Sequence, residues 1–248
     1  MSKLVLTPNE FRILEGPRHL WECAGTTALF HRKSKTSACA CSIWPVAPIL
    51  MGLAIALSCT ANSVVQDKNV LLVSLGDIPQ ESVEIAAQAL SEKYNVVLSF
   101  EKAELPDSAF YEPRSRHRAE RLLEFLEESY PGYDRVMGLT SQDISTTMGG
   151  KEDWGIFGLA RVGGKSAVVS TFRLNRNGVA TDKFENRLYK VIVHEYGHTV
   201  GLLHCEASDV CPMQHANGKV NTVDDSIDAL CEDCADQVSG DVRGEEDA

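Results

Sequence analysis

The feature that most constrains this chain is a run with the pattern HExxHxxGxxH, whose histidines stand at positions 194, 198 and 204. His194 and His198 are four residues apart, so in a helix their imidazoles project from one face and can bind one metal ion. Gly201 can adopt a left-handed conformation that ends the helix and lets His204 return as a third ligand. Three protein ligands leave one coordination position open, which is typical of catalytic zinc rather than structural zinc.

Glu195 stands directly after the first histidine, close enough to reach a metal-bound water without being a ligand. Zinc lowers the pKa of such a water to about 7 and polarises a carbonyl oxygen. Glu195 would take the water proton as a general base and pass it to the leaving amine. The run therefore predicts a peptidase that hydrolyses peptide bonds with zinc-activated water. The alternative is a non-catalytic zinc-binding interaction module at a cell surface, and the intact Glu195 argues against it.

Four cysteines follow the histidines within one short stretch, Cys205, Cys211, Cys231 and Cys234. Two cysteine pairs, one of them CxxC, match a structural zinc site with four thiolate ligands. Disulfides are the competing account, because an exported protein enters an oxidising compartment. We favour zinc, because a CxxC pair beside a histidine-rich metal site fits thiolate ligation.

With its residues in the order HExxHxxGxxHC…CxM…CxxC, the chain resembles the archaemetzincins, a metzincin branch of the zinc metallopeptidases. The resemblance covers roughly residues 68–234, and the segments 158–160, 170–174 and 187–190 also look like that family. It implies two zinc ions per chain. One is a catalytic zinc on the three histidines with Glu195 as base, and the other is a structural zinc on the four cysteines. It also implies that Met213 lies in the turn beneath the catalytic metal, where it packs and does not ligate.

The resemblance implies an α/β fold, a single compact metzincin-like domain. Its twisted mixed β-sheet would carry an active-site helix under a substrate cleft and a four-cysteine zinc subsite. By analogy, residues 156–162 would be an edge strand that pairs with an extended peptide substrate. The chain departs from the family in having five residues, rather than four, between Cys205 and Cys211. In some other metzincins a tyrosine at the position of His215 reaches the metal, but we expect His215 to be a surface histidine.

Apolar periodicity predicts the elements around this motif. A β-α-β pattern of continuous apolar strands indicates a sheet covered on both faces. We expect strands at residues 68–75, 96–100 and 134–139, helices at 80–94 and 114–130, and an antiparallel hairpin of strands 156–162 and 166–172. Asp182 would open the motif helix, with Glu185 as its capping-box partner. Residues 141–155 would be a pocket-forming loop, with Asp143 as a turn cap and Trp154 partly buried.

The whole chain has 248 residues and a formal net charge of −11, which repels phosphate and argues against nucleic acid as a partner. Residues 1–66 differ, because they hold six basic and only three acidic residues. A basic flank at 31–35 and a mostly apolar run at 38–57 are the parts of a secretory signal. The sequence Ala56-Leu57-Ser58-Cys59 also looks like a degenerate lipoprotein box that would lipidate Cys59. The remaining interpretation is a single buried or membrane-anchoring helix.

These patterns divide the chain into a leader at 1–66, a zinc metallopeptidase domain at 67–235 and an acidic flexible tail at 236–248. We expect a monomer that acts on a peptide or protein substrate. The leader favours an exported, periplasmic or membrane-anchored protein. A cytoplasmic protein is expected instead if the leader comes from a misplaced start codon.

Overall fold

The computed structural model describes residues 68–176 and 178–239. The predicted leader at 1–66, the proposed lipidation site Cys59 and the last part of the predicted tail, 240–248, lie outside these residues. Helix α5 runs from Glu232 to Ser239, beyond the predicted start of the tail at residue 236. Among the helices of the described part, none is both long and apolar enough to cross a bilayer.

The described residues form nine strands and five α-helices. The strands are β1 (Lys68–Leu75), β2 (Val96–Ala103), β3 (Phe110–Tyr111), β4 (Arg116–Arg118), β5 (Arg135–Thr140), β6 (Ile144–Met148), β7 (Lys151–Ile156), β8 (Gly158–Ala160) and β9 (Ser166–Ser170). The helices are α1 (Gln80–Lys93), α2 (Ala119–Ser129), α3 (Thr181–Thr199), α4 (Val220–Asp225) and α5 (Glu232–Ser239).

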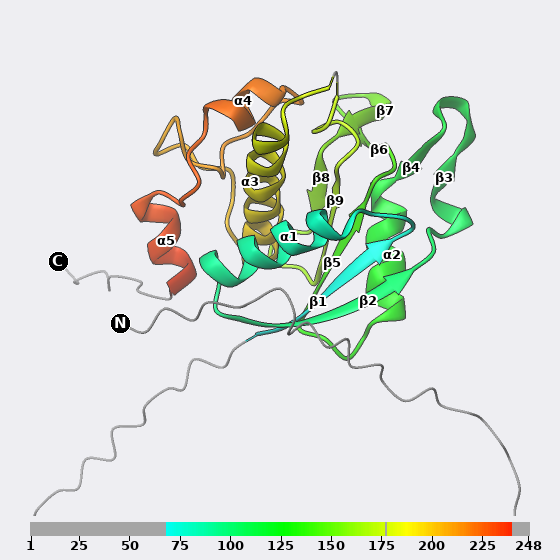
Figure 1. Cartoon of the computed structure of the whole chain (residues 1–248), viewed down its shortest axis with the longest axis horizontal. Helices are drawn as coiled ribbons and strands as arrows, with labels where there is room; N and C mark the ends of the chain where they lie inside the picture. Colours follow the sequence, from blue (N-terminus) through cyan, green and yellow to red (C-terminus); the bar gives the residue numbers. More distant parts are fainter. Residues whose placement is uncertain (1–67, 177, 240–248) are drawn as a thin grey trace, which may run out of the picture. The chain divides into compact units, whose positions relative to one another are not determined.

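The larger sheet has the strand order β2-β1-β5-β9-β8. Its first four strands pair in parallel, whereas β8 pairs antiparallel with β9 at the edge. Helices α1 and α3 lie on one face of this sheet and α2 lies on the other (Figure 1). Alternate residues of β1 face opposite sides, so that Val70 and Leu72 pack with α1 and α3 while Leu71 and Val73 pack with α2. Apolar side chains therefore cover both faces of the sheet, as the continuous apolar strands predict. The α/β class is confirmed.

A second sheet, with the order β3-β4-β6-β7, stands beside the first. Its hairpin of β6 and β7 occupies the segment that was expected to be a loop, residues 141–155. Asp143 is not a turn cap, because it accepts hydrogen bonds from Arg173 at 2.6 and 3.0 Å and pairs with Arg116 at 2.8 Å. Gly155 allows this arrangement, since a Cβ there would overlap the Arg173 guanidinium. These contacts fix the hairpin to the rest of the domain.

The predicted helix at 114–130 is wrong in its first turn, because α2 begins only at Ala119. Ser115 has a φ of 49°, a left-handed conformation that interrupts a helix. The next residues form β4, which pairs with β3 and β6. Arg116 is held there by ion pairs to two carboxylates, Asp143 and Asp153. The second sheet and its ion pairs thus override the helical pattern of this charged segment.

The predicted strand at 156–162 is two strands that belong to different sheets. β7 ends at Ile156 in the second sheet, and β8 begins at Gly158 in the first. Phe157 lies at the crossing, where its carbonyl oxygen accepts a hydrogen bond from Ser170 N at 2.8 Å. The antiparallel pairing of β8 with β9 is confirmed, and β8 is the predicted edge strand.

The predicted capping box on the motif helix does not form. α3 begins at Thr181 after Ala180, and no side chain caps its first turn. Asp182 is therefore already inside the helix and cannot act as its cap. As an acidic residue in the first turn, it still interacts favourably with the helix dipole.

Candidate active site

The motif residues lie at the carboxyl end of α3, where the buried face of the helix meets β8. α3 ends at Thr199, and Gly201 follows with a φ of 102°. Gly201 N donates a hydrogen bond to His198 O, and Leu202 N donates one to Gly197 O, each at 3.0 Å. This turn reverses the chain and returns His204 toward the helix, as the sequence predicts.

The three histidines come together as one group whose potential ligand atoms all lie within 4.8 Å of one another. The Nε2 atoms of His194 and His198 are 3.1 Å apart. Two nitrogens on a tetrahedral zinc are expected to be about 3.3 Å apart, given Zn–N bonds of about 2.0–2.1 Å. The spacing of the described atoms thus fits a zinc ion.

The protonation of the histidines also fits a metal. His194 Nδ1 donates a hydrogen bond to Pro212 O at 2.7 Å, and His198 Nδ1 donates one to Leu202 O at 2.7 Å. Each bond leaves Nε2 of a neutral ring with a free lone pair directed at the group. Burial lowers the pKa of His194 to about 3 and that of His204 to about 4 in the metal-free protein. The rings are therefore neutral at pH 7, as ligation requires.

Glu195 is 7% exposed and lies beside the edge strand β8. Burial is the cause that raises its pKa to about 8 in the metal-free protein. The close approach to the strand depends on Gly158, because a Cβ there would lie 2.6 Å from Glu195 Oε1. Burial of the carboxyl and the absence of a Cβ at Gly158 thus hold this ionisable group in one place.

Met213 lies directly beneath the histidine-bearing turn of α3 and is fully buried. Its sulfur packs so closely on the helix that a Cβ at Gly197 would lie 2.6 Å from Met213 Sδ. Tyr94 from the end of α1 supports the same turn by donating a hydrogen bond to Val193 O at 2.7 Å. Met213 and Tyr94, which are not among the residues that line the cavity, therefore support the histidine-bearing turn.

The four predicted cysteines form a second group within the same 4.8 Å limit. The sulfurs of Cys205 and Cys231 are 3.6 Å apart, and those of Cys211 and Cys234 are 3.9 Å apart. All four thiols are free, and a disulfide would need an S–S distance of about 2.05 Å. In a tetrahedral zinc site with Zn–S bonds of about 2.3 Å, the sulfurs are about 3.8 Å apart. The five-residue spacing before Cys211 is thus accommodated.

A cavity of about 260 Å³ opens in front of the histidines and Glu195. Besides these residues its walls come from β8, the hairpin of β6 and β7, and the chain from Gln214 to Ser226. Trp154 and Ile156 line it from the hairpin, and Val191 lines it from α3. His215 is exposed, as expected, and its ring stacks edge-on against His204 with 4.5 Å between centroids.

Sequence reasoning missed two walls of this cavity. One is the β6–β7 hairpin, for which Gly149-Gly150 between two β-rich segments was an available signal. The other is α4, together with Lys190 of α3. Lys190 stands four residues before His194 and therefore lies on the same face of α3. A lysine on a buried helical face was the available signal.

The sequence model of peptidase family M54 matches residues 86–239. The archaemetzincin of Haloquadratum walsbyi is 34% identical over 171 residues, which are 66% of this chain and 95% of the relative. The chain belongs to peptidase family M54. As a member of this family, it is a zinc metallopeptidase that acts on peptide or protein substrates.

Two solved structures of family M54 relatives have the same fold. The archaemetzincin of Methanopyrus kandleri superposes with a TM-score of 0.62 at 30% identity and covers 72% of this chain and 97% of its own. The archaemetzincin of Archaeoglobus fulgidus superposes with a TM-score of 0.59 at 27% identity and covers 68% of this chain and 99% of its own. The family M54 fold thus accounts for nearly the whole length of both relatives.

Proposed function

We propose that the protein hydrolyses peptide bonds with Glu195 as its general base and with His194, His198 and His204 holding the catalytic zinc. The observation that carries the proposal is the convergence of these four side chains at one cavity. When bound, zinc supplies a Lewis acid that activates water and stabilises negative charge on a carbonyl oxygen.

Glu195 performs the proton transfers of this proposal. Its carboxylate accepts a proton from the attacking water while the hydroxyl oxygen bonds to the carbonyl carbon of the substrate. The same carboxyl then donates that proton to the amine nitrogen as the C–N bond breaks. Burial raises the pKa of this carboxyl, which makes Glu195 a stronger base than an exposed carboxylate.

The edge strand β8 orients the substrate in this proposal. One edge of β8 is paired with β9 and the other faces the cavity. An extended peptide can add to such an edge through backbone hydrogen bonds, which brings its carbonyl groups past the histidines in a fixed order.

The four cysteines hold a second, structural zinc in this proposal, so that each chain binds two. Support comes from the free thiols and from sulfur separations of 3.6 and 3.9 Å. Four protein ligands leave no open position for a substrate. The second zinc therefore contributes to folding and not to hydrolysis.

We propose in addition that residues 1–66 export or anchor the protein, with Cys59 as a lipidation site. The basic flank and the apolar run that precede Cys59 support this. Labelling of the full chain with a fatty-acid analogue, compared with a Cys59→Ser variant, tests the lipidation. Label that depends on Cys59 supports an anchor, and the absence of label in both proteins contradicts it.

The Glu195→Gln variant tests the catalytic role. The amide keeps the size of the side chain but cannot accept the proton, so hydrolysis should fall by about 10²–10⁴-fold. The zinc content should not change, because Glu195 is not a ligand. Undiminished hydrolysis with zinc bound would exclude Glu195 as the base. A wild-type protein that binds zinc but cleaves nothing in a broad peptide library would favour the binding module instead.

A further inference from the structure

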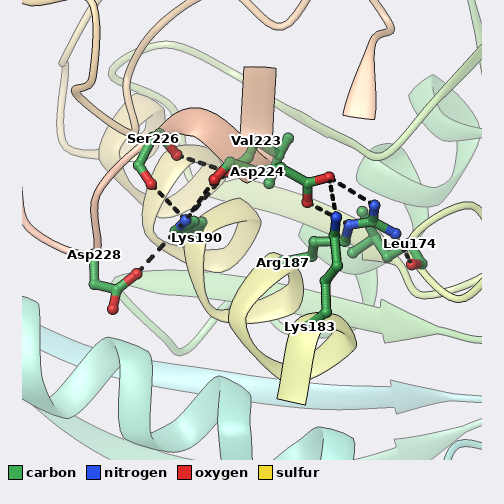
Figure 2. A network of polar contacts seen from close by, with 8 residues as sticks. All are labelled: Leu174, Lys183, Arg187, Lys190, Val223, Asp224, Ser226 and Asp228. Carbon is green, nitrogen blue, oxygen red and sulfur yellow. Dashed lines mark hydrogen bonds and ion pairs between the residues drawn. The ribbon is translucent and has the colours of Figure 1, made fainter. Parts of the chain in front are cut away.

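A buried ammonium group joins α3 to α4 beside the cavity. Figure 2 shows Lys190 on α3 with its side chain directed at the end of α4. Its Nζ donates hydrogen bonds to the backbone oxygens of Val223 at 3.2 Å and of Asp224 at 3.5 Å, and also to that of Ser226. The Lys190 side chain is 5% exposed. The Asp228 carboxylate lies 3.8 Å from the same Nζ. Since an ammonium has three donors, the three carbonyls satisfy its donors, and Asp228 balances its charge.

Two further cations of α3 bind the same short helix through its carboxylate (Figure 2). Arg187 forms a bidentate pair with Asp224, with N–O distances of 2.6 and 2.8 Å. Lys183 lies 2.9 Å from the same carboxylate. The Arg187 guanidinium is the main cause that lowers the pKa of Asp224 to about 2. Asp224 therefore stays charged at neutral pH, and the pairing persists.

α4 depends on these contacts for its position. It has only six residues and no side-chain cap at its first turn, and helices of this length are not stable by themselves in water. The last carbonyls of a helix have no partner within the helix. Lys190 supplies the missing donors from the neighbouring helix, so α4 is held against α3 at its carboxyl end.

α4 is also a wall of the cavity. The cavity is lined by Thr222 and Val223 of α4, by Ser226 just after it and by Val191 of α3. Lys190 lines the same space, and its ammonium is held by the three carbonyls and Asp228. A substrate side chain on this side of the cavity thus meets two valines and two uncharged hydroxyl residues, and the Lys190 ammonium beside them is already paired.

We propose that Lys190 is a positioning residue that fixes α4 as a wall of the substrate cavity and thereby limits the size of the apolar side chain that the cavity admits. This inference rests on the proposed peptidase function. Because the ammonium has no spare donor, the pocket prefers an apolar side chain to an acidic one. Removal of the ammonium takes a donor from all three carbonyls and leaves Val223 O only the Ser226 hydroxyl at 2.9 Å. The wall is then held less firmly, so it moves away and the pocket widens.

The Lys190→Met variant tests this in the full-length zinc-loaded protein, with peptides that differ only in one residue next to the cleaved bond. Methionine keeps the length of the stem and removes the donors. We expect the preference for phenylalanine over alanine, measured as the ratio of kcat/KM values, to increase by about tenfold, a size typical of pocket contacts. The change should be in KM rather than kcat, and the zinc content should equal that of the wild type.

Lys183→Met is the matched control, because Lys183 pairs with the same Asp224 from the same helix but is half-exposed and contacts no α4 carbonyl. Its side-chain preference should stay within about twofold of the wild type. If Lys190→Met does not fold, Asp224→Asn serves in its place. That change removes the charge that Arg187 holds and should increase the preference in the same direction by about threefold.

The proposal would be overturned if Lys190→Met folds, binds zinc and keeps the wild-type preference for phenylalanine over alanine. The same result in folded Asp224→Asn would also overturn it. In both cases the peptidase function would stand. A wild-type protein that prefers an acidic side chain at this position would also overturn it. By contrast, failure of the proposed function itself would appear as a wild-type protein that cleaves none of the peptides.

Discussion

The histidine group and the cysteine group are neighbours in sequence and differ in their surroundings. The three histidines face a cavity of about 260 Å³ beside a buried carboxyl group. The four cysteines belong to a small apolar cluster with Leu202 and Met213. Three ligands facing a cavity leave room for a substrate, whereas four ligands in an apolar cluster do not. In the proposed function, the histidine group therefore serves the chemistry and the cysteine group serves the fold.

The two groups are nevertheless joined through the backbone. Cys205 directly follows His204, and Cys205 N donates a hydrogen bond to Met213 O at 3.0 Å. Pro212, next to Cys211, accepts the hydrogen bond that orients His194. Damage to the cysteine group should therefore reach the histidine group, while damage to the histidine group should stay local. Four substitutions test this difference between the two groups and their surroundings, and they are given in order of decreasing expected effect on activity or stability.

Replacement of His204 by alanine should have the largest effect on activity. The variant loses one of three ligands, so one zinc should leave and hydrolysis should fall to background. Because His204 is exposed, the melting temperature should change little beyond the loss of that zinc. Zinc analysis together with a thermal scan checks this. A variant that keeps both zincs and its activity would show that His204 is not a ligand.

Cys234→Ser should have the largest effect on stability. Binding of a structural zinc is part of the folding free energy, so its loss should lower the stability by several kcal/mol. Hydrolysis should fall as well, because Cys205 and Pro212 no longer hold the histidines in place. Denaturant unfolding with and without a chelator measures the effect. Equal stability of variant and wild type before chelation would contradict a structural role for the thiolates.

Gly158→Ala should lower activity while leaving both metal groups intact. Its Cβ would lie 2.6 Å from Glu195 Oε1, so the carboxyl group must move. Misplacement of a catalytic group by about 1 Å can reduce the rate by about 10²-fold. Gly132→Ala is the control, because a Cβ there meets nothing within 4 Å. A Gly158→Ala rate equal to that of the control would show that the position of Glu195 tolerates the shift.

The smallest expected effect is a change of stability with pH, caused by the ion pair between Arg187 and Asp224 that holds α4. The pKa of Asp224 is lowered to about 2 from its usual 3.8 by Arg187. The pairing therefore adds stability at pH values above 3.8, and that stability is lost as the pH falls toward 2. The difference in denaturation midpoint between wild type and Asp224→Asn should shrink over this interval. A difference that does not change between pH 5 and pH 2 would contradict the pairing.

The histidine and cysteine groups were predictable because the residue types and spacings that define them lie within short segments of the sequence. The spacing of His194 and His198 defines a helical face, and Gly201 marks the end of that helix. The assignment of Met213 came from the family resemblance, and the structure adds its contact with Gly197. Patterns of this kind need no knowledge of distant parts of the chain.

The walls of the cavity were not predictable in the same way, because each depends on distant partners. Arg116 and its neighbours look helical by themselves and become β4 through pairing with β6 and ion pairs with Asp143 and Asp153. α4 has too few residues to show a helical period, and Lys190 holds it from α3. Such elements acquire their structure from tertiary contacts that override local propensity.

Zinc counting combined with thiol titration, on the protein shortened to begin at Lys68, tests the central claim most directly. The shortened chain retains only the four cysteines of the cysteine group. We expect two zinc ions per chain, one fewer after His204→Ala, and four thiols that react once a chelator has removed the metal. One zinc ion per chain with no reactive thiols would show that two disulfides replace the second metal. That result would contradict the assignment of a catalytic zinc to the histidine group and a structural zinc to the cysteine group.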